Sequence, residues 1–235
     1  MAGLDANTKL LLHFNDDVTT DATGNHTVSN NGVALDTSDK KFGAGSAVFS
    51  SAYLSSVDSA DWDIFGSNSD DWTVDFWGKL TTAGTYTRIM SQYADSSNIW
   101  IIAKFATGAL ASYAAVGGPT VVEFSSAAGI WTDTTTWHHI AWIKVADEYA
   151  FYFDGTQVAY IQDSSTANYT APLSIGYRGA SPEQYYPGKM DELRFQHSNY
   201  FGAAPNSGKT DTITVPTEEY SEDSAKTFTQ GIIIV

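Results

Sequence analysis

Short segments of strand-forming residues follow one another along almost the whole chain, at the spacing of about 8–12 residues that is typical of sandwiches and barrels. In the clearest of them, WTVDFWGKL at 72–80, apolar residues alternate, so Val74 and Phe76 are expected to share one face of a strand. Asp154 and Gly155 form a dipeptide typical of the tight turn that joins two antiparallel strands. No stretch predicts a long helix. The pattern indicates an all-β fold, a two-sheet antiparallel β-sandwich of roughly a dozen strands. The other expected strands are 86–93, 98–104, 109–116, 120–124, 137–145, 149–153, 156–161, 173–177 and 189–195.

The chain has 235 residues and no cysteine. A sandwich of this length buries roughly 70–75% of the surface that its unfolded chain exposes, so it needs no disulfide bond. The opening MAGLDANTKLLL lacks the basic and apolar regions of a secretory signal. No window approaches the roughly 18 uninterrupted apolar residues that cross a bilayer. We therefore expect a protein outside the membrane, assembled in the cytoplasm, carried out as part of something larger, or presented without its leader.

The acidic charge narrows the classes of partner. Lys and Arg number 12 against 27 Asp and Glu, which gives a formal net charge of −15. Such a surface repels nucleic acid and anionic lipid, so we expect neither as a partner. Calcium and neutral polysaccharide remain compatible with the charge, and so does a role in solubility alone.

The last part of the chain differs in character from the rest. Residues 206–235 carry a run of acidic side chains and end in the apolar sequence GIIIV at 231–235. An apolar, β-prone end promotes aggregation when it is left free, so it should pair with the sheet or with a neighbouring chain. We expect a sandwich domain at 1–205, followed by a C-terminal strap or assembly arm at 206–235. Neighbouring structural protein chains, or other copies in an oligomer, are then possible partners of this arm.

Four groups of segments carry a resemblance to a known family. They are 10–15 with 21–26 (LLLHFN and DATGNH), 41–49 (KFGAGSAVF), 72–77 (WTVDFW), and 137–141 with 153–155 and 188–195 (WHHIA, FDG and GKMDELRF). Their order and spacing resemble the laminin-G-like, concanavalin A-like jelly roll found in phage virion proteins and bacterial surface proteins. The resemblance covers about residues 8 to 200, and it departs from the family at Asp75, where the family usually has Glu. It implies a jelly-roll sandwich located on a virion surface or outside the cell.

Glycoside hydrolases with this fold place two carboxylates on one strand of a sheet, about 5–5.5 Å apart in retaining enzymes. Here Asp75 stands alone among apolar neighbours, and the adjacent Asp191 and Glu192 should point to opposite faces of a strand. Asp61 and Asp63 have the right spacing, but they lie in what looks like a helical turn at the rim. We therefore expect no catalytic activity.

His139 lies two residues after Trp137 and shares its strand face. A histidine on an apolar face is more often a packed, hydrogen-bonded residue than a ligand or a base. We expect His139 to be buried.

The resemblance also implies one structural calcium ion, held at the edge where the first and last strands meet. Its ligands would be Asp191, through side chain and carbonyl, together with Asn15 or its neighbour and the carbonyl of Gly43. In the alternative, Asp191 caps a turn by bonding backbone amides. A rim site is a further possibility, although its carboxylates could equally be solvated turn residues; it would use Asp16, Asp17 and Asp21.

Exposed aromatic residues beside short polar groups are the candidates for ligand binding, because sugars stack on aromatic rings while amides and charged groups bind their hydroxyls. The loop 176–187 is richest in such residues, and a second cluster lies at the hairpin tip near 93–100. The candidate ligand-binding residues are Tyr177, Arg178, Glu183, Gln184, Tyr185, Tyr186, Tyr93 and Trp100.

Two functions remain compatible with these features. The first is a non-catalytic binding module of a virion or cell surface that recognises a polysaccharide or glycoconjugate through rim loops and is stiffened by calcium. The second is a structural virion protein, a decoration or fibre domain, that acts through protein–protein assembly. A glycoside hydrolase is the least favoured alternative.

Overall fold

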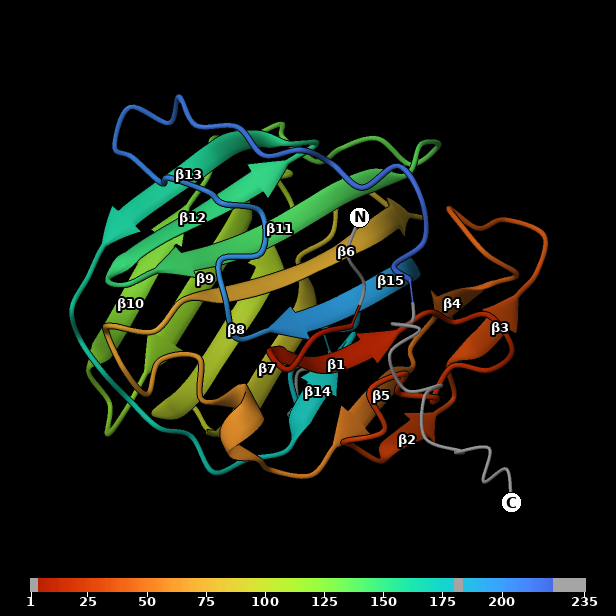
Figure 1. Cartoon of the computed structure of the whole chain (residues 1–235), viewed down its shortest axis with the longest axis horizontal. Helices are drawn as coiled ribbons and strands as arrows, with labels where there is room; N and C mark the ends of the chain where they lie inside the picture. The colour runs from red at the N-terminus through yellow and green to blue at the C-terminus, as the bar shows by residue number, and fades with distance from the viewer. Residues whose placement is uncertain (1–3, 180–183, 222–235) are drawn as a thin grey trace, which may run out of the picture.

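Two antiparallel sheets lie face to face in the computed structural model, which describes residues 4–179 and 184–221 (Figure 1). The larger sheet has eight strands in the order β13-β12-β11-β6-β15-β4-β3, with β1 also paired to β15. The smaller sheet has seven strands in the order β10-β9-β8-β7-β14-β5-β2. The predicted two-sheet antiparallel β-sandwich is therefore confirmed.

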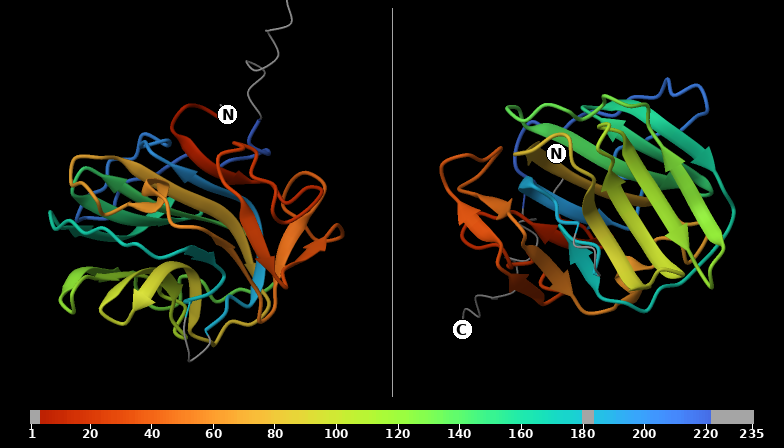
Figure 2. Two further views of the ribbon diagram at one scale, coloured as in Figure 1. Left: turned by 90° about the horizontal axis from the view of Figure 1, so that it is seen from below. Right: turned by 180° about the vertical axis from the view of Figure 1, so that it is seen from behind.

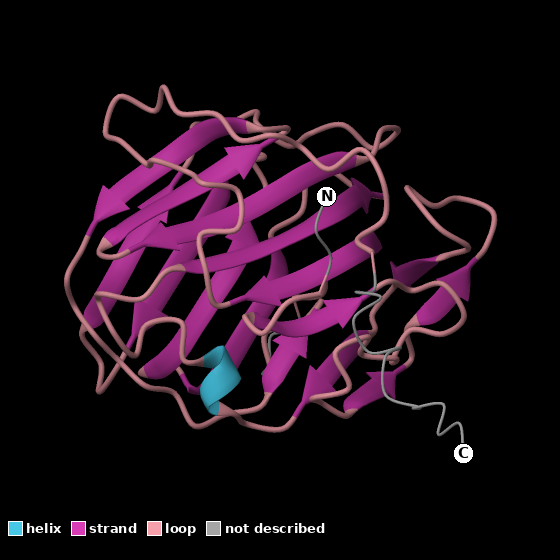
Figure 3. Ribbon diagram, in the orientation of Figure 1, coloured by secondary structure: helices cyan, strands magenta, loops and turns pink. Residues whose placement is uncertain are grey.

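The strands of the larger sheet are β1 (Thr8–Leu12), β3 (Ala34–Asp36), β4 (Ser46–Phe49), β6 (Trp72–Leu80), β11 (His138–Val145), β12 (Glu148–Phe153), β13 (Thr156–Gln162) and β15 (Gly188–Gln196). Those of the smaller sheet are β2 (Val28–Asn31), β5 (Tyr53–Ser56), β7 (Thr87–Asp95), β8 (Asn98–Lys104), β9 (Leu110–Ala115), β10 (Thr120–Ser125) and β14 (Leu173–Ile175). In the described ranges, the one helical element is the single turn η1 (Ala60–Trp62), drawn in cyan in Figure 3. No helix there is long and apolar enough to cross a membrane.

Several strands that follow one another in the sequence form hairpins, including the one expected to have its tip near 93–100. β7 pairs with β8, β9 with β10, and β11 with β12, all antiparallel. The turn from β12 to β13 has positive φ at both Asp154 and Gly155, 47° and 83°. Two successive positive φ angles give a turn whose twist matches that of the flanking strands, which is why this dipeptide joins them.

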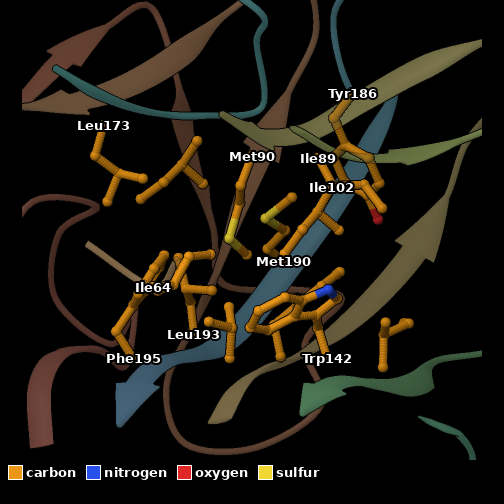
Figure 4. Close-up of a cluster of buried hydrophobic side chains, with 14 of the residues drawn as sticks. Ile64, Ile89, Met90, Ile102, Trp142, Leu173, Tyr186, Met190, Leu193 and Phe195 are labelled. Atoms are coloured by element: carbon orange, nitrogen blue, oxygen red, sulfur yellow. The ribbon is translucent and has the colours of Figure 1, made fainter. Parts of the chain in front are cut away.

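The main hydrophobic core lies between the inner faces of the two sheets. Val74 and Phe76 both point into it from β6, as their alternation predicts. Side chains from both sheets, such as Met90 and Trp142, meet there in the close-up of Figure 4. Each fully buried aliphatic or aromatic side chain contributes about 1.5–3 kcal/mol, so this core supplies most of the stabilisation of the sandwich.

A second apolar layer lies on the outer face of the larger sheet. Residues 197–221, called here the covering segment, cross this face as the blue chain in Figure 1. Ile213 and Ala203 pack on outward-facing residues of β11 and β12, among them Ala141 and Tyr152. Backbone hydrogen bonds join the segment to the start of β13, from Gln157 N to Asp211 O and from Ile213 N to Gly155 O. The described part of the expected strap, 206–221, is thus packed against the sandwich, and 222–235 lie outside the described residues.

The strand β15 contains a β-bulge in its middle. Asp191 is opposite Trp77 on β6, whereas Arg194, three residues later, is opposite Asp75, two residues away from Trp77. Glu192 absorbs the extra residue with a φ of 51°. The bulge interrupts the alternation of faces at Asp191 and Glu192, and both side chains are buried, as most of β15 is. Adjacent carboxylates are thereby held close to the edge formed by β1.

Candidate functional site

A hollow of about 480 Å³ lies on the outer face of the smaller sheet. Its floor is apolar and comes mainly from Ile99, Ile101 and Ala103 of β8, beside Ala111 of β9. These residues face outward because Trp100 and Ile102, which alternate with them, point into the main core. Figure 2 (right) shows β7 to β10 on this side of the molecule, where the covering segment does not cross the strands.

Aromatic and polar side chains surround this apolar floor. Tyr86 and Phe105 stack on each other at one end, with ring centroids 5.2 Å apart and an angle of 18° between the rings. Tyr113 lines the floor from β9, and Glu123 lines it from β10. Sugar-binding sites commonly combine aromatic ring faces, an apolar floor and a few polar groups in this way.

Two arginines complete the lining. Arg88 of β7 is buried, lies 4.1 Å from the centre of the Tyr86 ring and donates a hydrogen bond to the Tyr86 hydroxyl. Arg178 lies 4.9 Å from the ring centre of Tyr93. Burial lowers the pKa of the Arg88 guanidinium, and the positive charge of Arg178 lowers it further. The hollow therefore holds two cations close enough to repel each other.

Part of the predicted ligand-binding loop borders this hollow. Tyr177 stacks on Tyr185, with centroids 4.8 Å apart, and Tyr53 of β5 contacts Tyr177 at the same separation. Arg178, the next residue, reaches the hollow and contacts Tyr93 from the second predicted cluster. The structure thus brings the two predicted clusters together.

The ligand-binding prediction is wrong for two residues, Trp100 and Tyr186. Trp100 is fully buried, and its indole N–H donates to Gln92 Oε1 at 2.6 Å. Tyr186 is also fully buried, packed edge-on against Phe49, and its hydroxyl donates to the Lys189 carbonyl. Neither ring can offer a face to a sugar. Of the remaining two candidates, Gln184 is half-buried beside this loop, and Glu183 lies outside the described residues.

Most of the hollow itself was not predicted from the sequence. The missed lining residues include Tyr86, Arg88, Phe105, Tyr113 and Glu123. A signal was present, because β8 is apolar on both of its faces although one of them lies outside the main core. An apolar strand face that lies outside the core is expected to be covered by another segment or by a ligand. Once the strands are paired, the residues on β7 and β9 that lie beside this face can be identified.

The three residues expected to bind calcium meet at one place, the loop 41–44. Asp191 Oδ2 accepts hydrogen bonds from the backbone N–H of Lys41 at 2.7 Å and of Phe42 at 3.0 Å. Asn15 Oδ1 accepts one from the N–H of Ala44. Between them, Gly43 has a φ of +52°, and a side chain at this position would overlap the Asn15 amide. These hydrogen bonds are those of the alternative in which Asp191 caps a turn.

The second oxygen of Asp191 is the observation that favours a cation site. Asp191 Oδ1 is buried and has no hydrogen-bond partner among the described residues. Burial raises the pKa of this carboxyl to about 7, against the lowering effect of the two amide hydrogen bonds. A buried, unpaired oxygen beside Asn15 and Gly43 fits a hard cation such as calcium.

Next to this loop, His13, Glu192 and Glu219 bring one ligand atom each within 4.8 Å of one another. His13 Nδ1 lies 2.7 Å from Glu192 Oε1 and 3.6 Å from Glu219 Oε1. Asn15 donates to Glu219, and Tyr220 N–H donates to Glu192 Oε2. These hydrogen bonds tie the covering segment to β15 and to the loop that follows β1, and the cluster is accounted for by that role.

The possible rim site resolves into hydrogen-bonded turns. Asp17 accepts hydrogen bonds from Thr19 and Thr20, and these lower its pKa to about 2. Asp21 is buried and accepts from backbone amides that include that of Leu11. Asp16 lies beside them on a shallow pocket of the same rim.

The carboxylate considered for catalysis, Asp75, is fully buried beneath the covering segment. Its Oδ1 accepts from Arg194 at 2.9 Å, and its Oδ2 contacts His139 Nε2 at 3.1 Å and accepts from the hydroxyl of Tyr220. Although burial raises the pKa of Asp75, Arg194 holds it below the usual value. His139 is buried and hydrogen bonded, as predicted. The group works as a structural cluster that anchors Tyr220.

The sequence of this chain matches one known protein family. A model of the concanavalin A-like lectin/glucanase superfamily, of the laminin G type, matches residues 50–199. Among curated proteins, no sequence matches the chain.

Several solved structures share the architecture. Domain 4 of a GH43 extracellular arabinanase from Geobacillus stearothermophilus, in complex with arabinotriose, is 21% identical with a TM-score of 0.59; the match covers 83% of this chain and 94% of that one. The binding domain of botulinum neurotoxin DC in complex with SialylT is 13% identical with a TM-score of 0.60, covering 82% of this chain and 48% of that one. A botulinum neurotoxin type C structure, described as depending on two ganglioside molecules for cell entry, is 12% identical with a TM-score of 0.58 and the same coverage. The chain therefore spans about half of the toxin binding domains, and at these identities the likeness shows the fold alone.

Proposed function

Because this chain belongs to the concanavalin A-like lectin/glucanase superfamily, we propose that it is a glycan-binding module whose ligand lies in the hollow of the smaller sheet. The observation that carries the proposal is the outward apolar floor of β8, ringed by tyrosines and polar groups. The structural neighbours captured with arabinotriose and SialylT support a carbohydrate ligand. The outer face of the larger sheet is occupied by the covering segment, which leaves the smaller sheet as the face for binding.

We propose that the module acts without catalysis. Among the described residues that line the hollow, Glu123 is the single carboxylate. Hydrolysis of a glycosidic bond commonly needs two carboxylates flanking it. Asp75 and Glu192 lie on the other sheet and are buried there. One carboxylate among tyrosines and arginines favours binding over hydrolysis.

We also propose that calcium binds at the loop 41–44, through Asp191, Asn15 and the carbonyl of Gly43. The unpaired Asp191 Oδ1 supports it. A bound calcium ion would supply the positive charge that keeps this buried carboxylate ionised. The location of the module, on a virion or another extracellular surface, rests on the resemblance to phage virion and bacterial surface domains.

The binding proposal is tested at Tyr113, which lines the hollow from β9. Replacing Tyr113→Ala removes a ring face, and an aromatic contact of this kind contributes about 0.5–1.5 kcal/mol. We expect the variant to bind its glycan several-fold to tenfold more weakly by isothermal titration calorimetry, once a glycan array has identified a ligand.

Tyr160→Ala on β13 of the other sheet serves as the control, and it should bind as the wild type does. Array binding that is the same in the wild type and in Tyr113→Ala would contradict the assignment to the hollow. The absence of binding to every glycan on the array would contradict the proposed function as a whole.

Assembly with neighbouring chains is a second candidate function. The N–H of Leu4 donates to the carbonyl of Ser221 at 3.1 Å, so both ends of the described chain meet at one place on the sandwich. The residues that follow Ser221 end in GIIIV. A chain that leaves and enters the domain at one point could join neighbours in an assembly while its hollow stays available.

A further inference from the structure

The arginines of this chain are distributed unevenly. The sequence has three of them, Arg88, Arg178 and Arg194. Arg194 is buried in an ion pair with Asp75 at 2.8 Å and lies between aromatic rings under the covering segment. The other two line the same hollow on the opposite sheet.

Neither arginine of the hollow has an acidic partner in the described part of the chain. No Asp or Glu oxygen described there lies within 4.0 Å of a nitrogen of Arg88 or Arg178, although the sequence holds 27 Asp and Glu. The Nε atoms of both side chains are buried and make no hydrogen bond with any described residue. Arg88 is 9% exposed, so water does not compensate it fully.

The other charged and titratable groups of the hollow do not neutralise this pair. Tyr86 accepts a hydrogen bond from Arg88, and Tyr113 contributes its ring to the lining. Glu123 is exposed at the margin on β10 and carries one negative charge against two positive ones. A buried cation without a partner is costly, and two that repel each other cost more, so the hollow favours an anion between them.

We propose that the glycan bound in this hollow carries a carboxylate, as uronic and sialic acids do, and that Arg88 and Arg178 bind this carboxylate. This inference rests on the proposed function. A guanidinium presents paired N–H groups in a planar fork that matches the two oxygens of a carboxylate. The sugar ring would then lie on the apolar floor beside Tyr113.

A neutral polysaccharide is one of the partners compatible with the net charge of −15, but the local arrangement of the hollow favours an acidic one. At physiological salt, charges separated by more than about 8 Å are largely screened. The acidic surface elsewhere therefore acts weakly on a ligand in the hollow, whereas the two arginines act at contact distance. Local charge decides the preference here.

The test compares pairs of glycans that differ in an acid group, by calorimetry with the whole chain. The probes are sialyllactose with lactose, trigalacturonate with galactotriose, and a hyaluronan tetrasaccharide with chitotetraose. We expect an acid-bearing probe to bind at least tenfold more tightly than its neutral counterpart, and the ratio to fall as sodium chloride is raised from 50 to 500 mM. Hydrogen bonds to charged groups contribute enough for such a ratio.

Two variants locate the effect. Arg178→Gln changes a half-buried side chain and should abolish the preference for the acidic probe, so that the acidic probe and its neutral counterpart bind with similar affinity. Arg88→Gln should do the same, and its melting temperature is measured because Arg88 also packs on Tyr86. Lys209→Gln removes the same charge from an exposed position on the covering segment and should keep the preference.

The outcomes separate this inference from the proposed function. Equal binding of acidic and neutral probes, unchanged in Arg178→Gln, overturns the inference and leaves glycan binding intact. Binding of dextran sulfate without binding of any carboxylated probe overturns the carboxylate assignment. The failure of every probe, together with a glycan array without a hit, overturns both.

Discussion

At the scale of single residues, the two carboxylate oxygens of Asp191 have contrasting environments. One of its oxygens bonds two backbone amides, while the other is buried and unpaired among the described residues. The resulting pKa, raised to about 7 mainly by burial, means that this carboxyl is half protonated near neutral pH when no cation is bound. The free energy of folding therefore depends on pH in part through Asp191.

The sign of the pH effect follows from the raised pKa. The unfolded chain releases the Asp191 proton near pH 3.8, whereas the folded chain keeps it up to about pH 7. This contribution to stability is complete below pH 3.8 and is lost as pH rises to about 7, at most about 1.4 kcal/mol per pH unit. We expect the free energy of unfolding of the wild type, measured in EDTA by urea titration, to fall over this range relative to that of Asp191→Asn, which cannot titrate.

Calcium should reverse this loss, because it stabilises the ionised carboxylate. The melting temperature of the wild type should rise with calcium at pH 7, and that of Asp191→Asn should not. Asp70→Asn, an exposed position, is the matched control. An identical melting temperature in calcium and in EDTA would contradict the calcium proposal, whereas the predicted effect of pH on stability would still stand.

Single residues also show how far the sequence alone predicts the candidate site. His139 was predicted to be buried from its place beside Trp137, and it is. Trp100 and Tyr186 were misassigned because a loop or hairpin tip looks exposed in sequence, whereas the strand alternation at Trp100 and the packing of Tyr186 on Phe49 turn them inward. The hollow needs neighbours from β7, β8, β9 and β10, and only strand pairing reveals them.

At the scale of elements, the covering segment is held by its last described aromatic residue. The hydroxyl of Tyr220 donates to Asp75 Oδ2 and accepts from Arg194 Nη2, and the ring packs against the Arg194 guanidinium at 4.0 Å. A polar anchor of this kind fixes one register of the segment on the sheet. Apolar contacts such as those of Ile213 then cover the rest of the face.

Removing this hydroxyl tests the anchor. Tyr220→Phe leaves the ring in place but deprives Asp75 and Arg194 of a buried partner, and hydrogen bonds to charged groups contribute about 1.5–3 kcal/mol. We expect a loss of that size in the free energy of unfolding, measured by urea denaturation with an unchanged m-value. Tyr53→Phe, on the other sheet, should cost less than about 0.5 kcal/mol; equal losses in the two variants would argue against an anchoring role.

The long strands were predictable as elements and the short edge strands were not. β6, β7, β8 and β11 combine alternation with β-branched and aromatic residues, so the pattern alone indicates them. In contrast, β2 has the sequence VSNN and β3 has only three residues, and both form because β5 and β4 offer free edges. Their signal lies in the partner strand rather than in their own residues.

At the scale of the whole molecule, assembly is testable through the residues beyond the covering segment. The described residues 206–221 belong to the packed sandwich, so removing all of 206–235 would expose the layer beneath Ile213. Deletion of 222–235 alone spares that layer. If the arm joins neighbouring chains, this shorter chain should elute from gel filtration as a smaller species than the full chain while its melting temperature stays unchanged.

Glycan affinity per hollow should stay the same in the shortened chain, since the hollow lies on the other sheet. The same elution volume for both chains would contradict the assembly role. A fall in melting temperature with no change in size would show that the arm serves this domain alone.

The backbone hydrogen bond between Leu4 and Ser221 places both ends of the described chain at one point on the surface of the molecule. Figure 2 (left) shows both ends of the described chain on the side of the larger sheet, with β7 to β10 on the far side. A chain tethered to a support through either end would present its hollow outward, away from the support. Many copies in such a layer would face the same way, and weak individual contacts would then add up to firm adhesion to a repetitive polymer.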